Sequence, residues 1–357
     1  MKLFVGVNWD PKLIDEFDKL NQKYAPDVIG EVYGSMRGDP LGQVREADRL
    51  ADVSSAEVAR FVKRAHAKNI NVCYAINSPI ITPRHLAAKS GDVAVFLNWL
   101  CSIKIDNVIV ASPAFAKYLK EWMGDDDRAY GIIGSTVLNL RTLEQIEKFQ
   151  GIFDRICPAT DRNRDTLFLY KTNGMIPIEL LVNEMCLYQC PWRNYHYCQE
   201  AVDNLYMKND VIEELEDFPI DECWECFVKE PDNIIKSRWV RPEDTHIYEE
   251  FGVEWIKLSG RTMSTEWILR TTEAYISRRY SGNLLDLFPI VAGSLSTEKH
   301  GDRKFYIDNA RIIDIGHTLI ARDRGSCLTG CRQRSCDLCT RLWEDYVNEG
   351  IAGELNK

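Results

Sequence analysis

Twelve cysteines are the most informative chemical feature of this 357-residue sequence. Four of them lie within one short segment near the carboxyl end, in the pattern Cys327-x3-Cys331-x4-Cys336-x2-Cys339. Thiolates are soft ligands that select zinc or iron–sulfur clusters, and close spacing lets one loop wrap one metal centre. The spacing therefore predicts a metal site here, with zinc and an iron–sulfur cluster as alternatives.

A second group of thiols lies in the middle of the chain. Its members are Cys186, Cys190, Cys198, Cys223 and Cys226. Five thiols exceed the four positions of an ordinary tetrahedral centre, so one of them is spare. Neither group has the C-x3-C-x2-C spacing of a radical S-adenosylmethionine enzyme, because Arg193 and Arg334 occupy the positions where its third cysteine would stand.

Short apolar segments of β character alternate with amphipathic helical stretches and must position these thiols. The predicted strands are Leu3–Val7, Val28–Tyr33, Ile70–Ile76, Asn107–Ala111, Tyr130–Ser135, Phe153–Cys157, Ile178–Val182 and Trp255–Leu258. Continuous apolar runs are typical of parallel strands that are covered on both faces. Eight such strands that alternate with helices predict an α/β fold, a (β/α)8 TIM-like barrel.

The helices have recognisable starts. Ser54-x-x-Glu57 and Thr142-x-x-Gln145 are capping-box patterns, and Ser264 is the predicted N-cap of a helix over 267–279. We expect a barrel over residues 1–284 with a cysteine-rich insert at about 187–250. Residues 285–357 form a C-terminal cysteine-rich extension in this interpretation. Cys186 follows the seventh strand, at the barrel face that carries the chemistry in such enzymes.

Polar residues follow several predicted strands and are expected at the same opening. This set comprises Asn8, Glu31, Asn77, Ser112, Ser135, Asn183, Glu184 and Lys257. Arg37 and Arg45 lie on the loop after the second strand, where they could close over a substrate. Arginine offers a bidentate fork for a carboxylate or phosphate, which makes Arg193 and Arg261, with Lys257, candidate anion ligands. Glu31 and Glu184 either perform acid–base chemistry or pair with these cations, and His196 is either a ligand or a structural histidine.

Several motifs occur together in one order. Asn183-Glu184-Met185-Cys186 precedes Cys190-Pro191 and His196, Trp239 begins a Trp-Val-Arg-Pro-Glu-Asp stretch, and Lys257-Leu258-Ser259-Gly260-Arg261 follows; Tyr33-Gly34-Ser35 stands near the start. This combination resembles the collagenase-like peptidase family U-32, over most of residues 28–284. Active-site candidates matched to these motifs and strand ends are Glu31, Tyr33, Asn183, Glu184, Arg193, His196, Lys257 and Arg261.

The resemblance implies a TIM-like barrel that holds a [4Fe–4S] cluster through cysteines and takes part in oxygen-independent hydroxylation. Known relatives act in quinone biosynthesis and in hydroxylation of tRNA and rRNA, and some carry a peptidase label. Carried over by position, Cys186, Cys190 and Cys226 are the implied ligands, with Cys198 or Cys223 as the fourth. The C-terminal four-cysteine motif departs from the better-known members and raises the expected number of clusters to one or two.

Composition limits the remaining function classes. A net charge of −10 argues against a large nucleic-acid footprint, although a tRNA-sized substrate is compatible with it. No apolar run approaches the ~20 residues that cross a bilayer, and the start of the chain lacks the apolar core of a signal peptide. We therefore expect a cytoplasmic protein with no membrane partner.

The leading hypothesis is an iron–sulfur redox enzyme that hydroxylates or otherwise modifies a small-molecule, peptide or tRNA-conjugated substrate, with an electron donor as partner. One alternative is a non-catalytic, cluster-bearing subunit that pairs with a related barrel. Another is a peptidase with a structural metal site. The sequence contains neither a G-x-S-x-G elbow nor an H-E-x-x-H helix, so the familiar hydrolase machinery is missing.

Overall fold

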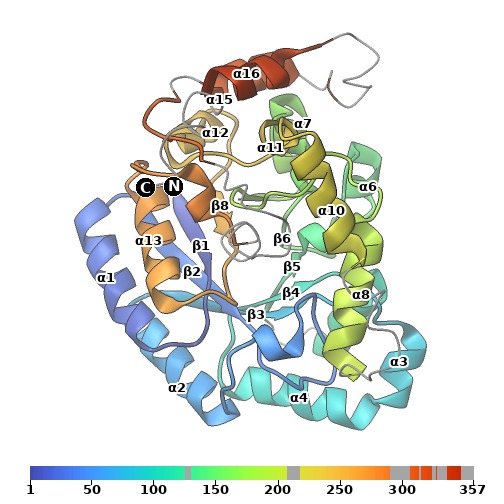
Figure 1. Cartoon of the computed structure of the whole chain (residues 1–357). Coiled ribbons are helices and arrows are strands. Elements are labelled where there is room, and N and C mark those ends of the chain that lie inside the picture. Colours follow the sequence, from blue (N-terminus) through green and yellow to red (C-terminus); the bar gives the residue numbers. More distant parts are fainter. Residues whose placement is uncertain are drawn as a thin grey trace.

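Eight parallel strands curl into a nearly closed barrel at the centre of the molecule (Figure 1). The computed structural model describes residues 1–124, 130–206, 218–289, 306–312, 315–323, 327 and 336–346. The strand order is β6-β5-β4-β3-β2-β1-β8-β7. A parallel bridge between Ile156 and Ile178 connects the two outer strands of this order. The predicted (β/α)8 barrel is confirmed.

All eight predicted strands are present. They are β1 (Lys2–Gly6), β2 (Val28–Gly34), β3 (Asn71–Ile76), β4 (Asn107–Val110), β5 (Gly131–Gly134), β6 (Arg155–Ile156), β7 (Glu179–Leu181) and β8 (Trp255–Leu258). The largest difference is β6, which is shorter than predicted. Only Arg155 and Ile156 pair with β5, whereas the preceding Phe153 is buried as part of the core.

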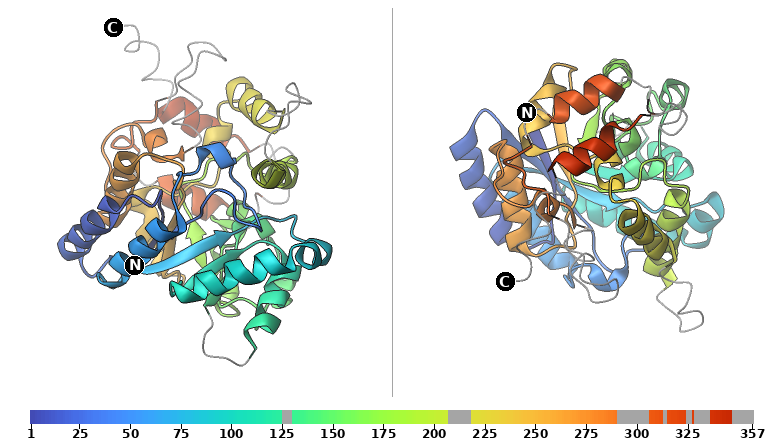
Figure 2. Two further views of the ribbon diagram at one scale, coloured as in Figure 1. Left: turned by 90° about the horizontal axis from the view of Figure 1, so that it is seen from below. Right: turned by 45° about the horizontal axis from the view of Figure 1, so that its top comes forward.

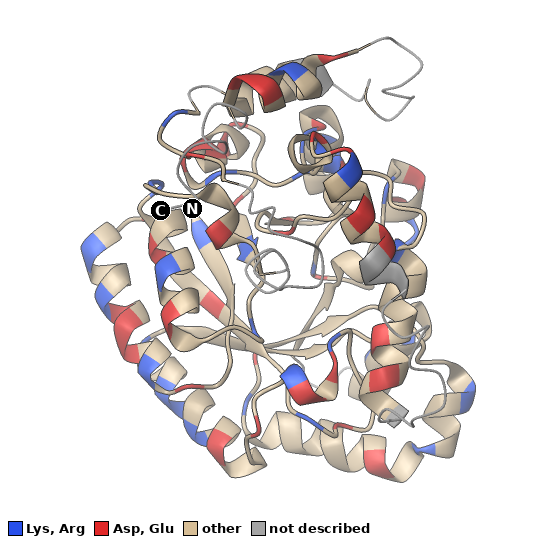
Figure 3. Cartoon of the chain, viewed as in Figure 1, with Lys and Arg blue, Asp and Glu red and all other residues tan. Residues whose placement is uncertain are grey.

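Helices surround the barrel and join its strands (Figure 1). They are α1 (Lys12–Tyr24), α2 (Ser55–His66), α3 (Pro83–Ala88), α4 (Ser90–Ser102), α5 (Pro113–Met123), α6 (Leu143–Glu147), α7 (Thr166–Asn173), α8 (Arg193–Tyr206), α10 (Phe218–Lys229), α11 (Asn233–Lys236), α12 (His246–Glu249), α13 (Thr265–Ile276), α15 (Ile315–Asp323) and α16 (Leu338–Tyr346). Lys, Arg, Asp and Glu are interspersed along the outer helices α1 and α2 (Figure 3).

The predicted N-caps are confirmed, although the helix expected over 267–279 spans Thr265–Ile276. Both hydrogen bonds of the capping box form at Ser54, where the hydroxyl accepts from the Glu57 amide and the Glu57 carboxylate accepts from the Ser54 amide. Thr142 forms the same reciprocal pair with Gln145, and Ser264 accepts a hydrogen bond from the Trp267 amide. These caps satisfy amides that the first turn of a helix leaves without partners.

Two apolar layers hold the barrel together. The larger lies between the strands and the surrounding helices. The smaller fills the barrel interior and comprises Phe4, Tyr33, Cys73, Ala75, Ile109 and Ile133. Among the described residues, no helix is long and apolar enough to cross a membrane.

The segment 187–250 contains α8, α10, α11 and α12, beside the carboxyl end of the barrel. Helix α16, drawn in red, lies against this segment (Figure 2). It packs on α11, and the Thr340 hydroxyl donates to Asp232 at 2.7 Å. The division into barrel, insert and extension stays a prediction, but chain segments distant in sequence do meet here.

Candidate active site at the barrel mouth

The barrel interior holds a chain of four alternating charges. Arg155 donates to Glu31 and, through Nε, to Glu179 at 2.8 Å, and Lys257 Nζ donates to the other Glu179 oxygen at 2.6 Å. The two carboxylate side chains are at most 1 % exposed. Two cations balance two carboxylates, which is the condition under which buried charge is tolerated. The expected place of Glu31 at the opening is wrong, because it lies inside the barrel, bonded to Arg155 and Asn107.

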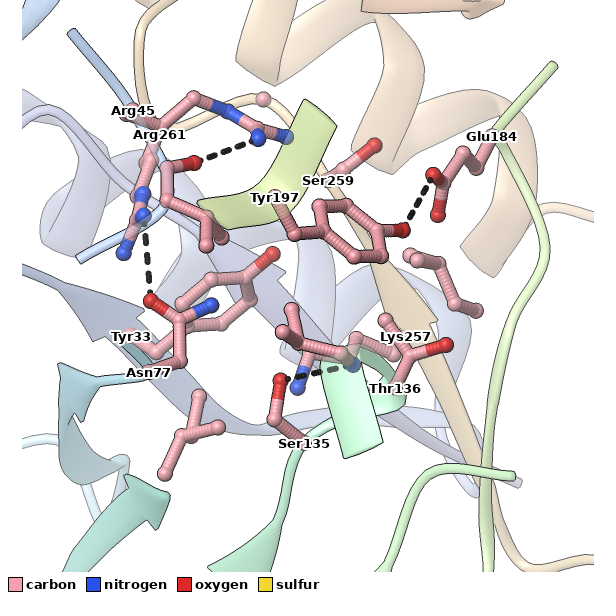
Figure 4. Close-up of a pocket in the computed structure, with 15 residues that line it drawn as sticks. Tyr33, Arg45, Asn77, Ser135, Thr136, Glu184, Tyr197, Lys257, Ser259 and Arg261 are labelled. Carbon is pink, nitrogen blue, oxygen red and sulfur yellow. Dashed lines mark hydrogen bonds between the residues drawn. The ribbon is translucent and has the colours of Figure 1, made fainter. Parts of the chain in front are cut away.

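A small cavity of about 50 Å³ lies where the carboxyl ends of the strands converge (Figure 4). Its polar lining comprises Tyr33, Arg45, Asn77, Ser135, Thr136, Glu184, Tyr197, Lys257, Ser259 and Arg261. Lys257 belongs to both regions, since its ammonium pairs with Glu179 below and its side chain borders the cavity above. Several strands and their loops thus contribute polar groups to one enclosed space.

Gly260 gives the Lys257-to-Arg261 segment its shape. Its φ is +147°, a conformation that side-chain-bearing residues rarely adopt. A Cβ at this position would also meet the Trp267 ring at 2.5 Å. The glycine therefore lets the chain turn sharply after β8, and Arg261 lines the cavity as a result.

Two guanidinium groups share the cavity. Burial and the neighbouring Arg45 lower the pKa of Arg261 to about 10. Arg261 Nη2 donates a long hydrogen bond of 3.5 Å to Asn77, whereas its buried Nη1 has no hydrogen-bond partner among the described residues. Within the same described set, neither Arg45 nor Arg261 has a carboxylate at salt-bridge distance.

Glu184 and Tyr197 border the opposite part of the cavity. The Tyr197 hydroxyl donates to Glu184 at 3.2 Å (Figure 4), and the Cys186 thiol donates to the same carboxylate oxygen at 2.9 Å. Burial and the adjacent Glu184 charge raise the pKa of the Cys186 thiol well above its ordinary value. Cys186 is therefore a protonated thiol at neutral pH in this arrangement, and it connects the cavity to the cysteine-rich segment.

A second, larger hollow of about 770 Å³ lies beside the segment that follows β7. Four thiols border it: Cys190, Cys226, Cys336 and Cys339. They come from the loop before α8, from α10, and from the start of α16. The two cysteine groups of the sequence thus border one space, which no spacing argument had predicted.

Cys223 and Cys198 differ in whether other thiols affect their pKa. Burial and then Cys190 raise the pKa of Cys223 to about 12, and Cys226 and Cys186 also lie within electrostatic range of it. Burial alone raises the pKa of Cys198, with no contribution from another thiol. These observations favour Cys223 over Cys198 as the fourth member of the central group.

The comparisons with known proteins give one relative over most of the chain. No family model matches. The protein named "Uncharacterized protease MJ1657", from Methanocaldococcus jannaschii, is 26% identical over 257 residues, which is 71% of this chain and 72% of that protein. The solved structure of the U32 peptidase Mk0906 has a TM-score of 0.48 and 13% identity, over 72% of this chain and 92% of that one. The chain is thus similar to a protein named a protease and to a U32 peptidase, in line with the resemblance that the sequence motifs carry.

The motifs that resemble the U32 family supply four residues of the mouth cavity: Tyr33, Glu184, Lys257 and Arg261. Asn183 lies nearby but is engaged by backbone, since its amide donates to the carbonyls of Ser259 and Leu287. Its oxygen accepts from the Ser259 amide at 2.7 Å. Asn183 thus ties β7 to the segment after β8, and its polar groups are directed to the protein itself.

Arg193 and His196 lie on α8 and do not line the cavity. Arg193 donates to Asp161 at 3.2 Å and to the Leu187 carbonyl at 3.0 Å, which anchors the loop that carries Cys190. His196 pairs with Glu200 one turn further along the helix. The His196 contact is of the structural kind that the sequence left as an alternative, and the Arg193 contacts are likewise with the protein's own groups.

The C-terminal group is described in part. Cys336 and Cys339 border the large hollow, and Cys327 is half-buried. Cys331 lies outside the described residues. The single four-cysteine site predicted for this segment therefore stays a prediction.

Sequence reasoning missed several residues of the site, among them Arg155 and Tyr197. Arg155 completes the interior charge chain, but an arginine in a predicted apolar strand gives no indication of its partners. Tyr197 borders the cavity one helical turn after Arg193 on α8. The spacing of four residues between an arginine and a buried tyrosine was the signal that could have identified this face of the helix.

Proposed function

We propose that this chain, which resembles the U32 peptidases, is an iron–sulfur redox enzyme that hydroxylates, or otherwise modifies, a small or conjugated substrate without molecular oxygen. The observation that carries the proposal is the shared hollow bordered by Cys190, Cys226, Cys336 and Cys339. Thiolates are the ligands of iron–sulfur clusters, and here four thiols from separate segments of the chain border one hollow.

The type of these residues fits a cluster, whereas their present arrangement does not form a metal site. Within the described part of the chain, no three Cys, His, Asp or Glu side chains are placed to hold a metal ion. Burial raises the pKa of Cys223 to about 12 and also raises that of Cys226, so both are protonated in this metal-free arrangement. Metal loading would draw the thiols together and release their protons.

The mouth cavity is the substrate site in this proposal. It adjoins the central thiols through the hydrogen bond from Cys186 to Glu184. When bound at these thiols, a cluster would supply electron transfer next to the cavity. The chain itself contributes an enclosed polar space in which Tyr33, Glu184 and Lys257 can orient a substrate.

Anaerobic purification tests the proposal directly. Iron and acid-labile sulfide should each approach about four or eight atoms per chain, for one or two [4Fe–4S] clusters. A colourless protein with stoichiometric zinc would contradict it. Cys186→Ala should remove the absorbance of the central cluster while far-ultraviolet circular dichroism keeps the helix signal.

Cys223→Ser and Cys198→Ser are a matched pair of variants for the fourth central ligand. Cys223 has thiol neighbours, whereas none contributes at Cys198. We therefore expect loss of cluster iron in Cys223→Ser and retention in Cys198→Ser. The reverse pattern would assign the ligand to Cys198.

A peptidase is the second candidate, because the curated relative is named a protease. The raised pKa of the Cys186 thiol argues against its use as a thiolate nucleophile. Peptidase activity that survives complete removal of iron would favour this alternative. If the chain turned out to be a non-catalytic partner subunit, turnover would appear only on addition of a related barrel.

A further inference from the structure

The mouth cavity carries more positive charge than its own residues neutralise. Arg261 is 6% exposed and lines the cavity, yet its Nη1 has no hydrogen-bond partner among the described residues. A buried guanidinium with an unused donor is costly unless a ligand satisfies it. Figure 4 shows Arg261 on the same side of the cavity as Arg45.

Arg45 adds a second positive charge to the cavity. Its Nη1 donates to the carbonyl of the adjacent Val44 at 2.7 Å, which does not neutralise its charge. Glu200 and Glu184 lie within electrostatic range of Arg45, but neither is at salt-bridge distance. Two like charges in one enclosed space repel each other, so an anion between them would relieve the repulsion.

From this arrangement we infer that Arg45 and Arg261 bind the carboxylate group of a small organic acid in the mouth cavity. The binding of a carboxylate stands on the cavity alone, whereas its identity as part of the substrate rests on the proposed function. The two guanidinium groups supply charge-assisted donors for such a group.

A carboxylate fits this cavity better than a phosphate does. Glu184 borders the same space, and its charge disfavours a dianion more than a monoanion. The cavity volume of about 50 Å³ leaves room for a small group only, and apolar residues such as Ile109, Val137 and Leu181 complete its lining. Such a mixed surface suits an acid with a short carbon skeleton.

Acetate titration of the purified chain tests the inference. The apparent melting temperature and calorimetric heats are measured at constant ionic strength, with sodium chloride replaced by sodium acetate or by phosphate. Wild-type protein should show saturable stabilisation by acetate, because ligands that bind only the folded state raise its stability. Arg261→Gln and Arg45→Gln should each weaken acetate binding by roughly tenfold or more.

Arg84→Gln is the matched control, since Arg84 is exposed on α3 and is not part of the cavity lining. It should bind acetate as wild type does. Arg45 is partly exposed, so Arg45→Gln keeps the test available if Arg261→Gln fails to fold. Equal acetate binding in all four proteins, no saturable effect in wild type, or preference for phosphate would each overturn the inference.

Iron content is measured on the same preparations and separates the two proposals. Acetate binding that depends on Arg45 and Arg261 in a chain without iron would support the carboxylate site and contradict the redox function. An iron-loaded chain that shows no response to acetate would support the redox function and contradict the carboxylate site.

Discussion

The barrel interior and the mouth cavity use buried charge in opposite ways. In the interior, Arg155 and Lys257 are matched by Glu31 and Glu179 through direct ion pairs. In the cavity just above, Arg261 has neither a carboxylate at salt-bridge distance nor a partner for Nη1 among the described residues. Charge that is matched inside the protein is tolerated by the fold, whereas charge that is left unmatched is available to a ligand.

Removal of one member of the matched chain should have the largest effect. Arg155→Met leaves Glu31 and Glu179 buried with Lys257 as their one remaining cationic neighbour in this charge chain, where it pairs with Glu179 alone. We expect a loss of about 3–5 kcal/mol in the free energy of unfolding, because an uncompensated buried charge is strongly unfavourable. Urea denaturation followed by circular dichroism measures this loss.

Arg278→Met is the control for that experiment. Arg278 pairs with Asp27 and Glu249, but it is 27% exposed, so its loss should cost no more than about 1 kcal/mol. The double variant Arg155→Met/Glu31→Gln should recover part of the stability. Equal losses for Arg155→Met and Arg278→Met would remove the distinction between matched interior charge and surface charge.

Asp39 is a buried carboxylate whose hydrogen-bond partners are neutral groups, and its substitution tests how much such burial costs. It accepts from the amides of Leu41 and Gly42 and from the Tyr74 hydroxyl, while burial raises its pKa to about 6. The folded state binds the Asp39 proton more tightly than the unfolded state does. The stabilisation that protonated Asp39 gives the folded state is therefore fully present below about pH 4 and is lost as the pH rises through 6. Asp39→Asn should therefore gain up to about 3 kcal/mol relative to wild type above pH 6.

The measurement for Asp39→Asn is the free energy of unfolding between pH 4 and 8. The two stability curves should diverge as the pH rises, because asparagine can keep the amide contacts without carrying charge. Parallel curves would show that Asp39 titrates at its ordinary value and that its burial costs little.

The smallest expected effect has the opposite sign to that of Arg155→Met. Arg261→Met removes a buried charge that lacks a carboxylate partner and lies beside Arg45, so we expect a gain of about 1 kcal/mol in the ligand-free protein. Thermal denaturation without added anions measures it. A large loss of stability would show that Arg261 is matched within the fold, like Arg155.

Much of the architecture could be predicted from local patterns. The apolar runs located every strand, and the residues at Ser54, Thr142 and Ser264 located helix starts, because both signals depend on neighbours in sequence. Polar residues after the strands were harder to place. Glu31 was expected at the opening but lies inside the barrel, since its depth depends on the stagger of β2 against β1 and β3.

The types of the functional groups were determined by the sequence alone: thiols in two spaced groups, and a glycine before Arg261 that permits a sharp turn after β8. Only the tertiary structure decided which of these groups meet. It brought Cys336 and Cys339 to the hollow of Cys190 and Cys226, and it matched Arg155 while leaving Arg261 unmatched. The physical reason is that electrostatic matching depends on distances across the fold, which residue order does not specify.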